Sequence, residues 1–254
     1  MLWYTGEDKM IDGLILAFQF LTRFPIKYEV EFNETNIRRS IFFFPFIGAV
    51  IGVMTALVYY PISLMNRDMA SLLAVIAMVV VTGGLHIDGL SDTFDGFLSN
   101  RDKERVLDIM KDSRVGAYGV LSTVILLLSK YVIISSFDNG IIHALILSLA
   151  NSRLVASRII SYKKNARLGG LGELFHNSKP GKSIIVVGII YIGMISIINV
   201  YYLIPLIMNF LMGELFSSWS YKKIGGMTGD TYGAIIEIGD IVSLLSYWGV
   251  LQWI

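Results

Sequence analysis

The sequence predicts an all-α protein, a polytopic integral membrane helical bundle with about seven transmembrane helices and one additional short helix near the N-terminus. Of the 254 residues, 54% are hydrophobic and 16% are charged, whereas soluble domains have about 25% charged residues. The mean hydropathy is +0.64, and several apolar stretches approach the roughly 20 residues that a helix needs to cross a bilayer. We expect residues 1–254 to form a single membrane-embedded catalytic domain.

The expected helices follow from the lengths of the apolar runs. Residues 10–22 form a run that is too short to cross a bilayer, which indicates an interfacial or re-entrant helix. Residues 183–218 form a run that is too long for one helix, so a turn is expected at 199–205. The expected spans are residues 40–61, 70–85, 118–136, 141–160, two within 183–218, and 234–253.

Basic residues alternate between successive loops. The loops on one side of the expected topology hold nearly all the Lys and Arg residues, and those on the other side hold only Arg67. Cytoplasmic loops of membrane proteins are enriched in Lys and Arg, so we expect the basic loops in the cytoplasm and the protein in the cell membrane. The basic loops are residues 23–39, 99–117, 161–182 and 219–229.

The overall charge and the absence of cysteine exclude several functional classes. The formal net charge is +1, which argues against general nucleic-acid binding. The chain contains no cysteine, which excludes disulfides, thiol catalysis and zinc–thiolate sites.

Residues 83–119 form the longest polar passage between apolar segments and are the main candidate for a functional site. Asp88, Asp92 and Asp95 stand at positions i, i+4 and i+7, which share one face of a helix. Like charges at this spacing destabilise a helix by roughly 0.2–0.5 kcal/mol per pair, so a cation is expected between them. Carboxylate oxygens favour Mg²⁺, with Mn²⁺ as the alternative.

Two further carboxylates, Asp108 and Asp112, repeat the i, i+4 spacing. Two short helices facing each other would bring both acidic groups to one metal centre, which would suit phosphoryl transfer. His86 precedes Asp88 by two residues and is a candidate general base, metal ligand or helix cap. The alternative interpretation of this passage, which we favour for Asp102, is a solvated helix face.

Polar side chains within the expected spans are costly in a bilayer and indicate function by default. Asn151 and Arg153 are expected near the cytoplasmic end of their span, where Arg153 could clamp a phosphate or form a structural ion pair. Glu237 and Asp240 could bind a metal, a hydroxyl or an amide, or pair with Arg153. Lys130 is expected to extend outward toward the membrane surface.

The segment GGMTGD, residues 225–230, is rich in glycine. It matches no established phosphate-binding loop, so by itself it is a weak signal for phosphate binding. It makes Thr228 and Asp230 candidate substrate contacts. Asp230 would share a face with Glu237 if the last span were helical from this point.

Three strings together resemble one family. GGLHIDGLSDTFDG (83–96), IMKDSRVGAYG (109–119) and GGMTGDTYGAIIE (225–237) are similar to cobalamin synthase, the adenosylcobinamide-GDP ribazoletransferase family. FFPFIGAVIG (43–52) and ARLGGLGELF (166–175) also resemble that family, so the likeness covers nearly the whole chain.

The resemblance implies a Mg²⁺-dependent membrane enzyme that acts late in the assembly of the nucleotide loop of vitamin B12. Such enzymes join adenosylcobinamide-GDP to α-ribazole or α-ribazole 5′-phosphate and release GMP. The product is adenosylcobalamin or its 5′-phosphate. The implied partners are these substrates and the lipid bilayer, with no nucleic acid. A homo-oligomer or a corrinoid-assembly complex is also compatible with it.

The resemblance also implies roles for the residues singled out above. The expected metal ligands are Asp88, Asp92, Asp95, Asp108 and Asp112. The expected catalytic residues, one of which accepts the proton of the attacking hydroxyl, are His86, Asp92, Asp95 and Asp112. The expected substrate and phosphate contacts are Lys111, Arg114, Arg153, Asn151, Thr228, Asp230 and Glu237.

Two other functions remain as alternatives. CDP-alcohol phosphotransferases carry DxxDG followed by DxxxD, which this chain matches with Asp92-x-x-Asp95-Gly96 and Asp108-x-x-x-Asp112. That family has an Ala-Arg pair soon after the DG, where this chain has Leu98-Ser99, and this departure disfavours the match. A cation transporter could use the aspartates as an ion site, but they cluster at one face, whereas transporter sites usually lie at mid-bilayer.

Overall fold

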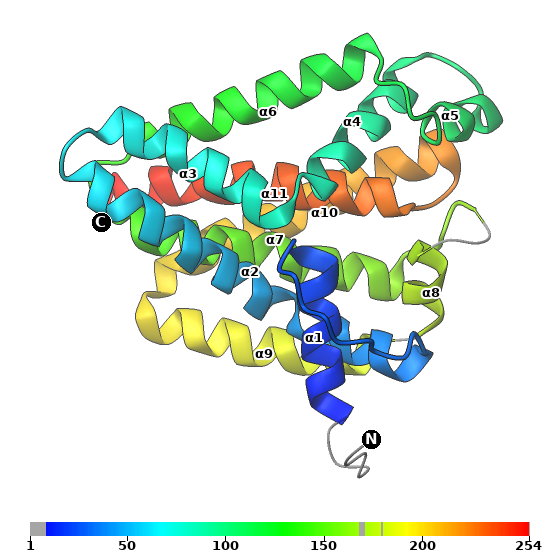
Figure 1. Ribbon diagram of the computed structural model, residues 1–254, viewed down its shortest axis with the longest axis horizontal. Coiled ribbons are helices and arrows are strands. Elements are labelled where there is room, and N and C mark those ends of the chain that lie inside the picture. Colours follow the sequence, from blue (N-terminus) through cyan, green and yellow to red (C-terminus); the bar gives the residue numbers. More distant parts are fainter. Residues whose placement is uncertain (1–8, 168–170, 179, 254) are drawn as a thin grey trace.

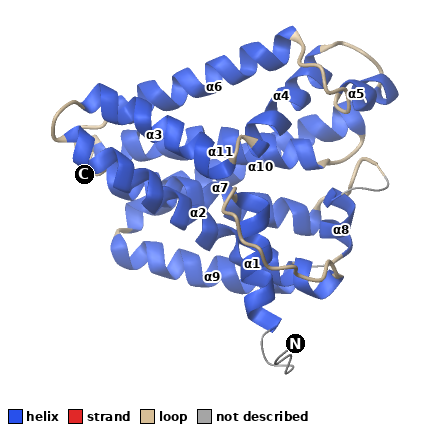
Figure 2. Cartoon of the chain, viewed as in Figure 1, coloured by secondary structure: helices blue, strands red, loops and turns tan. Residues whose placement is uncertain are grey.

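The structure is a computed structural model that describes residues 9–167, 171–178 and 180–253. Over these ranges the chain is helical, with no strand beyond one isolated bridge between Asn165 and Met227 (Figures 1 and 2). The predicted all-α class is therefore confirmed. The helices are α1 (Lys9–Leu21), α2 (Glu34–Ser63), α3 (Arg67–Thr82), α4 (Leu85–Leu98), α5 (Lys103–Ile109), α6 (Ala117–Ser135), α7 (Ile141–Tyr162), α8 (Leu171–Asn177), α9 (Gly181–Ile198), the 3-10 helix η1 (Val200–Tyr202), α10 (Leu203–Ile224) and α11 (Gly229–Leu251).

The described helices include five that are long and apolar enough to cross a membrane, namely α2, α6, α7, α10 with η1, and α11. A sixth crossing results if α3 and α4 are counted as one broken span. The apolar parts of α1 and α9 are shorter. Each of the seven expected spans corresponds to a helix, and the membrane-embedded class is confirmed, but the number of seven crossings is not. The interfacial or re-entrant position expected for α1 stays a prediction.

Two spans begin earlier than their apolar runs indicate because polar caps extend them. Helix α2 begins at Glu34, and the side chain of Asn33 accepts a hydrogen bond from the backbone N–H of Asn36 at 2.9 Å. Helix α11 begins at Gly229, after a capping box formed by Thr228 and Thr231. Such caps satisfy backbone N–H groups that have no partner within the helix. The early start of α11 places Asp230 on the helix.

Two consecutive glycines end α3 and turn the chain. Gly83 and Gly84 have φ values of +67° and +72°, a left-handed conformation that other residues rarely adopt. A β-carbon at Gly83 would also collide with the side chain of Arg23. As a result α4 runs at 91° to α3. Helix α4, which carries the acidic stripe, is not by itself among the described helices that are long and apolar enough to cross a membrane.

Helices α7 and α11 lie in the middle of the bundle, with α6 along one edge and α9 along the opposite edge (Figure 1). Helix α7 packs against α2, α11, α10, α9 and α8. Helix α11 packs against α4, α6 and α10 as well as α7. Any group on the inner faces of α7 and α11 is therefore remote from both water and lipid.

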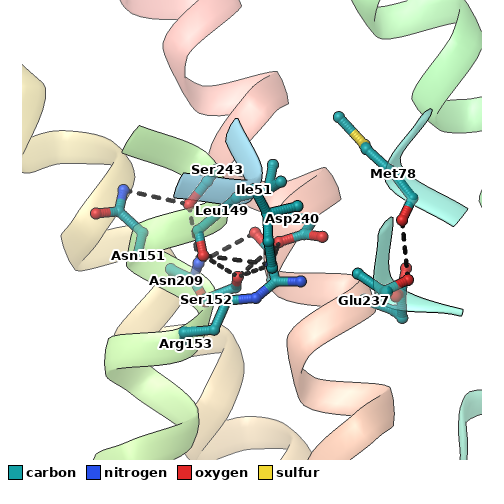
Figure 3. A network of polar contacts seen from close by, with 12 residues as sticks. Ile51, Met78, Leu149, Asn151, Ser152, Arg153, Asn209, Glu237, Asp240 and Ser243 are labelled. Atoms are coloured by element: carbon teal, nitrogen blue, oxygen red, sulfur yellow. Dashed lines mark hydrogen bonds and ion pairs between the residues drawn. The ribbon is translucent and has the colours of Figure 1, made fainter. Parts of the chain in front are cut away.

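Four charged side chains meet in this interior. Lys130 of α6 donates hydrogen bonds to Glu237 Oε2 at 2.6 Å and to Asp240 Oδ2 at 3.1 Å. Arg153 of α7 donates to Asp240 Oδ1 at 2.6 Å, and Ser152 Oγ donates to the same oxygen at 2.6 Å. The four charged side chains are at most 3% exposed. Figure 3 shows the part of this network around Arg153 and Asp240.

The network contains two cations and two anions, so its formal charges cancel. This corrects the expectation that Lys130 extends outward, because its ammonium group lies between two carboxylates that would otherwise be buried without a cation. The alternative considered for Arg153, a structural ion pair, is what the structure shows. These contacts join α6, α7 and α11. Because the four side chains are buried, water cannot replace any of their partners.

Neutral side chains extend the polar interior toward α9 and α10. Asn151 accepts a hydrogen bond from the hydroxyl of Tyr191 at 2.8 Å. Asn209 donates one to Ser243 Oγ at 2.8 Å and one to the carbonyl oxygen of Gly239 at 3.0 Å. Hydrogen bonds of this kind hold helices together in lipid, where apolar surfaces gain little by associating.

Replacing Lys130 by methionine should strongly destabilise the protein. The substitution leaves Glu237 buried without a cation, and breaking one partner of a buried ion pair costs about 3–5 kcal/mol. The free energy of unfolding, or the melting temperature in detergent, should fall accordingly. Arg67→Met is the matched control, because Arg67 pairs with Asp138 at 2.9 Å where the two side chains are 48% and 75% exposed, and such pairs contribute about 1 kcal/mol or less. Equal effects of the two substitutions would contradict the interior role of Lys130.

Candidate active site

Helices α4 and α11 approach each other closely at glycine positions. A β-carbon on Gly89 would lie 2.9 Å from the carbonyl oxygen of Asp230 and 3.0 Å from its Cα. A β-carbon on Gly233 would lie 3.1 Å from the carbonyl oxygen of His86. All three distances are shorter than ordinary van der Waals contacts, so this crossing depends on the absence of side chains. It brings the acidic face of α4 to the N-terminus of α11.

Asp88, Asp92 and Asp230 form one acidic group at this crossing. Asp88 is exposed and Asp92 is half-buried. Burial raises the pKa of Asp92 to about 7, and the charges of Asp88, Asp230 and Asp95 raise it in the same direction. Arg167 lies 3.4 Å from Asp230 and offsets part of the negative charge. The stripe expected on a helix is therefore present, with Asp230 added to it from a distant part of the chain.

Asp95 lies on the same helix but has a different set of contacts. Its two carboxylate oxygens accept hydrogen bonds from the backbone N–H groups of Gly116 and Gly119, at 2.7 and 2.8 Å. Gly116 is the residue before α6, so the negative charge lies at the positive end of that helix. These bonds connect α4 to α6 across the polar passage.

The second acidic pair lies at the surface. Asp112 accepts hydrogen bonds from the Arg114 side chain, the shortest at 2.6 Å, and this pairing lowers the pKa of Asp112 to about 2. Asp108 and Lys111 are exposed. Over the described ranges, no three or more His, Asp and Glu side chains are grouped so that they could hold a metal ion. The five expected metal ligands therefore lie in different surroundings, and their role in binding a metal stays a prediction.

His86 is buried on the inner side of α4. Its Nδ1 has no hydrogen-bond partner among the described residues. Burial lowers the pKa of His86 to about 3, and the positive charge of Arg153 contributes to the same shift. The imidazole is therefore neutral at physiological pH and is a poor proton acceptor.

The remaining expected substrate contacts divide into two groups. Arg153, Asn151 and Glu237 belong to the polar interior described above. Thr228 lies at the crossing, where it caps α11 and donates a hydrogen bond to Asp230 Oδ2 at 3.3 Å. In the ARLGGLGELF string, residues 168–170 lie outside the described residues.

A cavity of about 200 Å³ adjoins the acidic group. Asp88, Asp230 and His86 line one side of it, and Phe20, Phe44 and Phe175 line another. The three phenylalanines come from α1, α2 and α8. Sequence reasoning did not find Phe20 and Phe44 as site residues, because no local pattern relates these segments to each other.

Comparison with known proteins supports the resemblance found in the sequence. The family model described as cobalamin-5-phosphate synthase matches residues 13–248. The chain belongs to this family. Proteins named adenosylcobinamide-GDP ribazoletransferase are 39% identical over 238 residues in Clostridium novyi (92% of this chain, 95% of the relative) and 34% identical over 251 residues in Treponema denticola (91% and 95%). A third, from Clostridium botulinum, is 36% identical over 245 residues (93% and 97%).

Membership of the cobalamin-5-phosphate synthase family makes this chain a transferase of cobalamin biosynthesis. No solved structure matches it. The part that matches the family model contains Asp88, Asp92 and Asp230 of the acidic crossing and all three phenylalanines of the cavity. The site described here therefore lies within the region that defines the family.

Asp92→Asn should stabilise the protein at pH 8 and have little effect at pH 4. The folded-state pKa of about 7 lies above the ordinary value of 3.8, so between these values the folded state retains a proton that the unfolded state has lost. Stability of the wild type therefore falls as the pH rises from about 4 to about 7, and the amide removes this loss. Melting temperatures measured across this range in detergent test it.

The matched control for this measurement is Asp102→Asn. Asp102 caps α5 by accepting a hydrogen bond from the N–H of Arg105 at 3.0 Å, and asparagine caps helices about as well as aspartate. This variant should show no pH-dependent gain. An Asp92→Asn variant that is no more stable than the wild type at pH 8 would show that the carboxylates do not repel one another as described.

Proposed function

We propose that this chain transfers the phosphocobinamide group of adenosylcobinamide-GDP to a ribose hydroxyl of α-ribazole or α-ribazole 5′-phosphate. GMP would be the other product. The names of relatives that are 34–39% identical support these substrates. The observation that carries the proposal is the grouping of Asp88, Asp92 and Asp230 beside a cavity. Carboxylates so placed would hold a divalent cation, and that cation would offset the negative charge of the diphosphate.

In this reaction the oxygen of the ribose hydroxyl attacks the phosphorus that is attached to cobinamide. A new phosphorus–oxygen bond forms, the bond from that phosphorus to the bridging oxygen of GMP breaks, and the hydroxyl proton passes to a base. Asp92 is the residue best suited to be this base, because its pKa of about 7 lies near physiological pH. His86 is too weak a base, and both oxygens of Asp95 already accept hydrogen bonds from the start of α6.

The acidic group also fits a divalent cation. Mg²⁺ commonly binds through one or two carboxylates together with substrate phosphates and water, so Asp88 and Asp230 would suffice without a complete protein cage. When bound, the cation neutralises charge on the diphosphate and on the departing GMP. Mn²⁺ would fit the same oxygen ligands. Asp92 would ionise more readily beside such a charge and would then be ready to accept a proton.

We further propose that the site lies on the cytoplasmic face of the cell membrane. The acidic crossing is formed by the segments that flank the basic loops 99–117 and 219–229, and Arg167 comes from the basic loop 161–182. Enrichment in Lys and Arg is typical of cytoplasmic loops. A nucleotide-activated substrate made in the cytoplasm would then reach the site directly.

The purified protein, reconstituted in lipid with Mg²⁺, should release GMP only when both adenosylcobinamide-GDP and α-ribazole are present. Asp92→Asn should lower kcat by about 100-fold or more, the usual contribution of a positioned general base, while the protein remains folded. Asp102→Asn should retain wild-type turnover. Chromatographic measurement of GMP with melting curves of each variant provides the comparison.

Other results would favour the alternative functions. Release of CMP from a CDP-lipid and an alcohol, without GMP release from the corrinoid substrate, would indicate a lipid phosphotransferase. Ion flux through proteoliposomes without nucleotide turnover would indicate a transporter. An active Asp92→Asn enzyme would show that another group accepts the proton.

A further inference from the structure

The cavity beside the acidic group has an aromatic wall built from three separate helices. The rings of Phe20 and Phe175 lie 4.8 Å apart between centroids, and those of Phe44 and Phe175 lie 5.9 Å apart, both edge to face. Phe44 and Phe175 are 3% and 7% exposed. Edge-to-face packing fixes the orientations of the rings, so the wall is a rigid, apolar surface formed before any ligand enters.

The size and lining of the cavity restrict what can occupy it. Apolar cavities of about 150 Å³ lined by Leu, Ile and Phe are known to bind benzene, so a cavity of about 200 Å³ accommodates a small fused ring system. A corrin macrocycle is far larger. Guanine carries several hydrogen-bonding groups on its edges, and those that lie against the phenylalanines would have no partners.

The cavity lies directly beside the acidic group. Asp88 and Asp230 belong both to the lining of the cavity and to the acidic group at the helix crossing. Asp88 is exposed, so the cavity opens where the diphosphate is expected. A molecule with its apolar ring in the cavity would therefore present whatever is attached to that ring to Asp88, Asp92 and Asp230.

We infer that this cavity binds the flat, apolar, bicyclic base of the acceptor nucleoside. The inference rests on the proposed function, in which that acceptor is α-ribazole, a riboside of dimethylbenzimidazole. With the base against Phe44 and Phe175, the ribose lies at the mouth of the cavity and its hydroxyl faces Asp92. The cavity thus determines which acceptor reacts, and the acidic group determines which bond is broken.

His86 supplies the polar contact that such a base requires. The benzimidazole ring of a riboside keeps one nitrogen that accepts a hydrogen bond and has no N–H group. His86 lines the cavity, and its buried Nδ1 has no hydrogen-bond partner among the described residues. An imidazole N–H donor is the complement of a single acceptor nitrogen on a ring. His86 is therefore a specificity-determining residue of this cavity.

The first test needs no substitution. Free dimethylbenzimidazole should compete with α-ribazole for the wild-type protein in lipid, and it should not compete with adenosylcobinamide-GDP. Equilibrium binding of radiolabelled α-ribazole, without the corrinoid substrate, gives the same information independently of turnover. Guanosine should not displace the label. Failure of the free base to displace bound α-ribazole would overturn the inference.

The second test compares two phenylalanines on the same helix. Phe44→Ala should weaken α-ribazole binding and raise its KM by about tenfold, as expected for the loss of one aromatic contact to a base, with little change in the KM for adenosylcobinamide-GDP. Phe42→Ala is the matched control, because Phe42 is partly buried on α2 against Leu154, Val187 and Leu206, away from the cavity. Equal effects of the two substitutions would overturn the inference.

Additional variants separate loss of folding from loss of binding. Phe44→Leu retains an apolar side chain at this position and should also weaken α-ribazole binding if the aromatic surface matters. Ile236→Trp should fill the cavity and abolish binding of α-ribazole while the melting temperature shows that the protein remains folded. His86→Phe should weaken α-ribazole binding without shifting the pH profile of kcat.

The outcomes distinguish the inference from the proposed function. GMP release by the wild type with unchanged α-ribazole affinity in Phe44→Ala and Phe44→Leu would refute the cavity and leave the reaction intact. No GMP release and no binding of α-ribazole by the wild type would refute both. A lipid or detergent acyl chain that occupies the cavity and that dimethylbenzimidazole cannot displace would overturn the inference.

Discussion

The buried ion network of Lys130, Arg153, Glu237 and Asp240 is the interaction on which the rest of the structure depends. It places two carboxylates of α11 against cations of α6 and α7, in a region that excludes water. Removing any member would leave the network with an unbalanced charge in a medium that solvates it poorly. Helix α11 therefore has a defined rotation and depth in the bundle, and both of these determine where its N-terminus lies.

The acidic crossing follows from that fixed position. With α11 held in place, Gly233 faces His86, and Asp230 lies against Gly89 with the two backbones in close contact. The carboxylates of the two helices are then near enough to raise one another's proton affinity, as the pKa of Asp92 shows. The carboxylates of the site therefore repel one another, and favourable contacts elsewhere in the fold hold them together. Such groups of like charges are common where a protein binds cations or phosphates.

The aspartates of the polar passage have different surroundings, although their spacing makes them look equivalent. Asp95 accepts two backbone hydrogen bonds at the start of α6, and Asp112 pairs with Arg114 at the surface. Asp88 and Asp92 are left to act with Asp230. The turn at Gly83 and Gly84 makes this division possible, because it directs α4 away from α3 so that one end reaches α6 while its acidic face meets α11.

The sequence by itself determined the helical class, the approximate limits of each span and the acidic stripe on α4. These features depend on local quantities, namely the length of an apolar run, the capping residue before it and the spacing of three aspartates. Only the tertiary structure decided that Lys130 points inward, that Asp230 joins Asp88 and Asp92, and that Phe20, Phe44 and Phe175 enclose one cavity. The reason is that a helix in a membrane is apolar on nearly all sides, so its sequence does not show which face meets which neighbour until the polar side chains have found partners on other helices.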